Sequence, residues 1–68
     1  MNKFGERLKS LRNEKNISRQ QLATDLNVSA RLISYWENNQ RECDFETLNK
    51  IADYFSVSCD YLLGRTDY

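Results

Sequence analysis

The stretch SRQQLATDLNVSARLISYWEN, residues 18–38, contains two short helical patterns with a brief interruption between them. Each pattern follows a serine, which is a preferred N-cap because its hydroxyl accepts a backbone N–H of the first turn. We expect one helix over residues 19–26, with Gln21 completing a capping box with Ser18, and another over 30–38. The interruption is too short for antiparallel packing, so the two helices should cross steeply.

Three residues in this stretch have the spacing of a helix-turn-helix unit. Ala23 is small enough for a close crossing, Asn27 tolerates a turn four positions later, and Ile33 supplies a β-branched apolar residue ten positions after Ala23. Small, turn and apolar residues at these offsets are typical of such a unit. The alternative interpretation is an ordinary tight corner between two helices of a small bundle.

The second helix of this pair has two contrasting faces. At about 100° per residue, Leu32, Ile33 and Trp36 fall on one side, where we expect the core. The opposite side has hydrogen-bonding groups and no carboxylate, while Glu37 lies on the flank. A face without acids suits a groove lined by phosphates, and a solvated polar face is the alternative interpretation. The side chains of this face belong to Arg31, Ser34, Tyr35 and Asn38.

Apolar residues recur at helical spacing in the rest of the chain as well. They predict further helices over about residues 3–14, 45–55 and 59–63, the last closed by Gly64. A chain of 68 residues has room for one domain, so we expect an all-α, compact five-helix bundle over residues 1–68. Residues suited to left-handed turns between these helices are Asn16, Asn27 and the pair Asn38-Asn39.

Charge is distributed unevenly although the formal net charge is zero. Residues 1–41 contain eight basic and four acidic side chains, whereas residues 42–68 contain two basic and six acidic ones. Such asymmetry favours binding of a polyanion to the basic first part of the chain, with the acidic second part turned away from it.

The absence of histidine excludes several kinds of chemistry, because imidazole is the commonest general base and metal ligand. Cys43 and Cys59 are too few for a zinc site. We expect both to be free thiols at partly buried helix positions, with a disulfide between them as the alternative. We therefore expect that the protein is not an enzyme and has no catalytic residue. We also expect that it binds no metal, no other cofactor and no small-molecule ligand.

No apolar run approaches the roughly 20 residues that a membrane span needs. The N-terminal sequence MNKFGERLKS also lacks the apolar centre of a signal peptide. We therefore expect a cytoplasmic protein with no membrane partner.

Residues 8–65 resemble the Xre/Cro repressor-type helix-turn-helix family. The resemblance depends on Ser-Xaa-Xaa-Xaa-Leu-Ala at 18–23, Val-Ser at 28–29, Ile-Ser-Xaa-Trp-Glu-Asn at 33–38 and Asp-Tyr-Leu-Leu-Gly at 60–64. It implies a lambda repressor-like domain that binds double-stranded DNA sequence-specifically and regulates transcription.

The resemblance also implies roles for single residues. Arg12 and Glu37 match a structural ion pair between the first and third helices. Arg19 stands where the family usually has glutamine on a phosphate, and Cys43 where proline is common, so we expect a charged phosphate contact and a looser loop. The base-reading positions hold Ala30, Arg31, Ser34 and Tyr35. Positions suited to phosphate contact hold Ser18, Arg19, Asn38, Gln40 and Arg41.

One unit of this kind reads only about four or five base pairs, so we expect a homodimer with half-sites roughly 34 Å apart. We expect a repressor on a palindromic operator. The alternative is an antitoxin or controller protein whose main role is to bind a partner protein. The expected dimer surface is formed by Tyr54, Tyr61, Leu62, Leu63 and Tyr68, and closure of the core by these side chains is the alternative interpretation.

Overall fold

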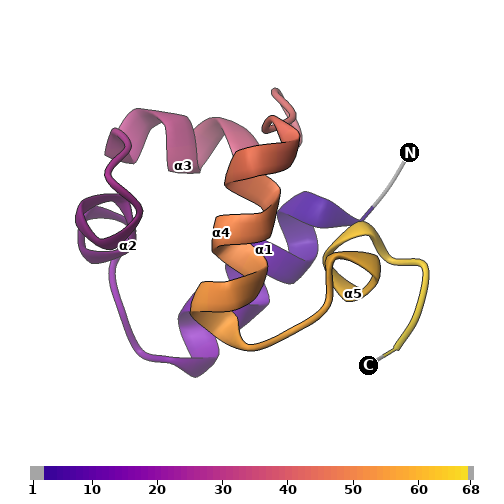
Figure 1. The fold of residues 1–68 in the computed structure, drawn as a ribbon. Coiled ribbons are helices and arrows are strands. Elements are labelled where there is room, and N and C mark those ends of the chain that lie inside the picture. Colours follow the sequence, from indigo (N-terminus) through magenta and orange to yellow (C-terminus); the bar gives the residue numbers. More distant parts are fainter. Residues whose placement is uncertain (1–2, 68) are drawn as a thin grey trace.

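Five helices joined by short loops account for residues 3–67, the part of the chain that the computed structural model describes. No strand occurs within that part. The first helix begins one residue later than expected, and the third ends one residue earlier. The helices are α1 (Phe4–Glu14), α2 (Arg19–Leu26), α3 (Ala30–Glu37), α4 (Phe45–Phe55) and α5 (Cys59–Leu63), shown in Figure 1.

Side chains immediately before α2, α3, α4 and α5 accept N–H groups of the first turn, whereas α1 begins without such a cap. The hydroxyls of Ser18 and Ser29 accept the backbone N–H groups of Gln21 (3.0 Å) and Leu32 (3.1 Å). The capping box expected at Ser18 is only half formed, since the Gln21 side chain does not accept the Ser18 N–H; its amide nitrogen donates to Asp25 (2.9 Å), one turn further along. The same kind of cap begins α4 at Asp44 and α5 at Ser58.

Left-handed backbone ends most of these helices. Serine seldom adopts this conformation, and the sequence gives no warning of it at Ser56, which closes α4 at φ 57°. The N–H of the next residue, Val57, donates to Ala52 at 3.0 Å and completes the turn. The other left-handed residues are Asn16 (φ 58°), Asn27 (φ 61°), Asn39 (φ 57°) and Gly64 (φ 79°).

Every helix contributes to one apolar core. In Figure 1, α2 and α3 lie at one end of the molecule and α5 lies at the other, with α1 and α4 between them. Leu32, which the helical spacing placed in the core, is only partly buried against it, and so is Phe55. The buried side chains are Phe4, Leu8, Leu11, Leu22, Ala23, Leu26, Ile33, Trp36, Leu48, Ile51, Ala52 and Leu62.

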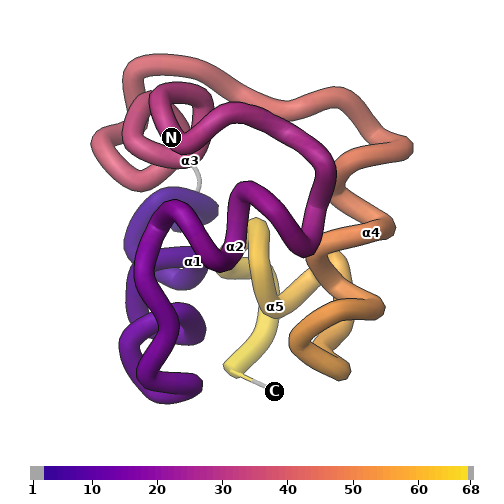
Figure 2. Tube along the Cα trace, turned by 90° about the vertical axis from the view of Figure 1, so that its left-hand side faces the viewer, coloured from indigo at the N-terminus to yellow at the C-terminus, as the bar shows by residue number. Residues whose placement is uncertain are grey.

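The C-terminal part of the described chain returns to α1. Arg7 Nη1 donates to the carbonyl of Thr66 (3.3 Å), and the Arg7 guanidinium lies over the Tyr61 ring, 4.2 Å from its centroid. Figure 2 shows α5 between α1 and α4. None of the helices within residues 3–67 has both the length and the apolar character to cross a membrane.

Candidate nucleic-acid interface

The corner between α2 and α3 is built from the three residues that the spacing argument singled out. Ala23 and Ile33 are fully buried, and Asn27 adopts the left-handed conformation between the two helices. The N–H of Val28 donates to the carbonyl of Ala23 at 2.9 Å. This bond closes the turn, and the two helices lie directly against each other.

The outward face of α3 is polar and contains no acid. Arg31 is exposed, whereas Ala30, Ser34 and Tyr35 are partly exposed. Ile33 and Trp36 point into the core from the other side of the helix. The four expected base-reading side chains therefore reach solvent on one helix. Asn38, which follows α3, is also exposed.

Tyr35 supports an arginine from the loop after α3. The Arg41 guanidinium carbon lies 4.9 Å from the centroid of the Tyr35 ring, an arrangement favoured by the charge distribution of the aromatic face. The N–H of Gln40 donates to the carbonyl of Tyr35 at 2.8 Å, so the loop is held against the helix. A hollow of about 350 Å³ is lined by Ser29, Arg31, Leu32, Tyr35 and Arg41.

Glu37 is buried, although the helical spacing placed it on the flank of α3. Arg12 Nε donates to Glu37 Oε2 at 2.7 Å, and Arg12 Nη2 donates to Oε1 at 3.2 Å. Arg19 Nε donates to the same Oε1 at 3.1 Å. The carboxylate of α3 thus joins a residue of α1 to the first residue of α2.

Gly5 is a position that the sequence analysis did not single out. A Cβ built on it would lie 2.5 Å from the carbonyl oxygen of Trp36, closer than atoms of that kind can approach. Only glycine therefore allows the start of α1 to meet the end of α3 in this way.

The residues expected at a dimer surface do not form one exposed group. Leu62 is fully buried, so that assignment is wrong: its side chain packs in the core and cannot contact a partner. Tyr54 donates its hydroxyl to Asp25, which raises the pKa of Tyr54, and Tyr61 lies under Arg7. Leu63 is partly buried, and Tyr68 lies outside the described residues.

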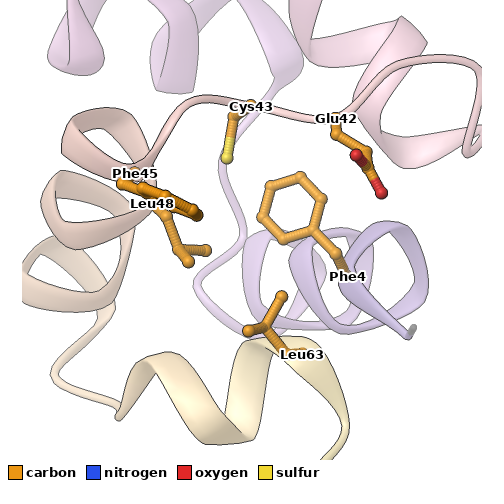
Figure 3. A pocket seen from close by; sticks show the side chains of 6 residues that line it. All are labelled: Phe4, Glu42, Cys43, Phe45, Leu48 and Leu63. Carbon is orange, nitrogen blue, oxygen red and sulfur yellow. The ribbon is translucent and has the colours of Figure 1, made fainter.

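An exposed aromatic residue was missed instead. Phe45 is 86% exposed, because side chains in the first turn lean beyond the start of the helix, where little covers them. It borders a hollow of about 220 Å³ together with Phe4, Glu42, Cys43, Leu48 and Leu63. In Figure 3 the apolar side chains of these residues surround the opening.

Both cysteines are free and partly buried, but Cys43 lies in the loop before α4 and not in a helix as expected. Burial raises the pKa of its thiol to about 11, which keeps it protonated near neutral pH. No group of three or more cysteine and carboxylate side chains within residues 3–67 could hold a metal ion.

Comparison with known proteins agrees with this geometry. A model of the helix-turn-helix family matches residues 8–62. The HTH-type transcriptional activator BcrR of Enterococcus faecalis is 43% identical over 61 residues, which are 90% of this chain and 30% of that protein. The HTH-type transcriptional regulator ImmR of Bacillus subtilis is 35% identical over 64 residues, which are 94% of this chain and 50% of that protein.

Among solved structures, the P22 c2 repressor protein in complex with a synthetic operator matches with a TM-score of 0.85 and 32% identity. The match covers 93% of this chain and 96% of that one. The present chain spans half or less of the length of BcrR and ImmR. From the family match, the shared fold and the buried corner between α2 and α3, this chain belongs to the Xre/Cro-type helix-turn-helix family.

Proposed function

We propose that this protein is a transcriptional regulator that binds double-stranded DNA sequence-specifically. The observation that carries the proposal is the acid-free outward face of α3, with Arg31 at its start and Arg41 held beside it on Tyr35. A helix of this width fits the major groove of B-form DNA. The match to a repressor solved with its operator supports the same partner.

Arg31 is the proposed reader of sequence. Its guanidinium can donate two parallel hydrogen bonds to O6 and N7 of one guanine, the commonest specific contact in the major groove. Ala30, Ser34 and Tyr35 lie on the same outward side and complete the proposed base-reading set. Ala30 can contact a thymine methyl group.

The proposed phosphate contacts flank this set. The Ser18 hydroxyl accepts the N–H of Gln21, while the N–H groups that precede it in α2 have no acceptor inside the helix, and a helix N-terminus attracts anions. The loop that follows α3 offers exposed side chains of Asn38, Gln40 and Arg41. Phosphates bound at these two places would hold α3 in the groove.

We further propose that two copies act together as a repressor on a palindromic operator. One helix reads too few base pairs for a unique site, and two-fold related half-sites solve this problem. Repression requires only that the bound protein occupy a promoter. The relatives include an activator as well as a repressor, so transcription of a reporter gene with and without the protein decides the direction. The relatives are bacterial, and we infer the cytoplasm as the place of action.

A second candidate function is that of an antitoxin or controller that binds a partner protein. The 86% exposed Phe45 beside an apolar hollow favours this candidate. The two functions are compatible, since the hollow does not include the outward side chains of α3.

Selection of bound duplexes from a random pool tests the primary proposal. We expect enrichment of a two-fold symmetric sequence with half-sites about one helical turn apart. Equal recovery of all sequences would contradict sequence-specific binding. Enrichment of a single half-site would contradict the dimer and leave the base-reading role of α3 intact.

A further inference from the structure

Glu37 accepts hydrogen bonds from two arginines, although one guanidinium is enough to balance its charge. The side chain of Glu37 has no exposed surface, and that of Arg12 is only 10% exposed. Arg12 uses its three nitrogen groups within the protein, because Nη1 also donates to the carbonyl of Ile17 at 3.0 Å. The Arg12–Glu37 pair is therefore complete without a further partner.

Arg19 is placed differently. Its side chain is 43% exposed, and its bond to Glu37 uses only Nε. Within residues 3–67 the structure gives no acceptor to its Nη1 and Nη2 groups. These groups lie at the far end of a planar guanidinium whose Nε edge faces the protein. Arg19 is also the first residue of α2, where the helix N-terminus favours an anion.

We infer that Arg19 is a positioning residue that links one DNA phosphate to the recognition helix α3. Nε stays on the buried carboxylate of Glu37 while Nη1 and Nη2 bind the phosphate. The inference rests on the proposed DNA-binding function. Because Glu37 is the last residue of α3 and cannot shift in the core, the phosphate bound through Arg19 sets the position of α3 in the groove.

The chemistry of the side chain makes this link specific to arginine. A guanidinium has five N–H donors in a fixed plane and can serve two acceptors on different edges. The single nitrogen of a lysine keeps the charge but cannot hold both acceptors in the same geometry. Glutamine can reach a phosphate but has no charge to offer to Glu37.

The variant Arg19→Lys keeps the positive charge but removes the guanidinium, so it distinguishes the proposed link between phosphate and Glu37 from an effect of charge alone. We expect it to bind specific and random duplexes about fivefold to tenfold more weakly than the wild type, with an unchanged salt slope, because the charge remains near the phosphate. Arg19→Gln should lower the salt slope by about one per monomer. Arg65→Lys is the matched control, since Arg65 forms an exposed pair with Asp60 of α5 (3.7 Å), and Figure 1 shows α5 and α2 at opposite ends of the molecule.

Binding of Arg19→Lys within about twofold of both the wild type and Arg65→Lys would overturn the inference. A wild-type chain that prefers no duplex would instead overturn the proposed function, and the link with it. Thermal unfolding of each variant establishes that the assays compare folded proteins.

Nuclear magnetic resonance of the wild-type chain gives a test that needs no variant. We expect the Arg19 Nε–H to remain protected from exchange in both the free and the DNA-bound protein, while rotation of its terminal amino groups slows when DNA binds. Loss of Nε–H protection on binding would overturn the inference, because the side chain would then leave Glu37 to reach the phosphate.

Discussion

At the scale of the residue, Arg31 is the one basic side chain of α3 and is exposed at its start. Arg31→Ala should weaken binding to the selected operator by about 1–3 kcal/mol and relax preference at one base pair per half-site. Fluorescence anisotropy with operator and random duplexes measures both effects. Arg41→Ala is the comparison variant, because a lost phosphate contact weakens all sequences alike. Equal losses for the two duplexes with Arg31→Ala would contradict its reading role.

The pair formed by Tyr35 and Arg41 gives a second prediction at this scale. Tyr35→Phe keeps the ring that supports the guanidinium, so affinity for random duplex should stay close to that of the wild type. Tyr35→Ala removes the ring and should cost about 0.5–1 kcal/mol, the value of an exposed cation–π contact. Titrations in the same buffer compare the two. A loss with Tyr35→Phe as large as that with Tyr35→Ala would assign the role to the hydroxyl group instead.

At the scale of the element, Glu37 joins α1, α2 and α3 through its two arginine partners. Glu37→Gln leaves the buried Arg12 without its carboxylate, so the free energy of unfolding should fall by about 3–5 kcal/mol. Urea denaturation followed by circular dichroism measures the change. Glu14→Gln, at the exposed end of α1, is the control and should shift stability by less than about 0.5 kcal/mol. If both variants changed the free energy of unfolding by similar amounts, the bonds of Glu37 to Arg12 and Arg19 would contribute little to stability.

The end of α4 gives another prediction for an element. Ser56 occupies left-handed backbone at φ 57°, where a side chain is strained and glycine is not. Ser56→Gly should raise the free energy of unfolding by about 0.5–1 kcal/mol, after the greater entropy of glycine in the unfolded chain offsets part of the gain. Asn27→Gly is the matched variant at φ 61° and should gain less, since asparagine tolerates this region better. If thermal unfolding showed that Ser56→Gly lowers the stability, the claim that Ser56 has a strained backbone would be wrong.

At the scale of the whole molecule, the helix pair lies at one end and α5 at the other, as Figure 1 shows. In the proposed dimer, two copies on one operator would meet the same face of the duplex, because half-sites one helical turn apart face the same side. Inserting about five base pairs between the selected half-sites turns one site to the opposite face and should abolish cooperative binding, whereas inserting about ten restores the facing. Gel-shift titrations compare the three spacings. Equal affinity for all of them would contradict a dimer that binds as a unit.

The sequence by itself was enough for the helices and their ends, because these depend on residues close together in the chain. The serine caps at Ser18 and Ser29 and the turn at Asn27 act over three or four residues. Helical periodicity likewise identified the acid-free face of α3. Even at this scale Ser56 escaped prediction, since nothing nearby in the chain indicates that a serine will adopt a left-handed turn.

Only the tertiary structure decided which side chains are buried and which are free to bind. Leu62 was expected at the surface and lies in the core, whereas Phe45 is left exposed. Glu37 lies on the flank of an isolated helix and becomes buried only where Arg12 and Arg19 meet it from two other helices. Burial depends on how helices cross, and the residues that meet at a crossing are far apart in the chain, so no local pattern records the contact.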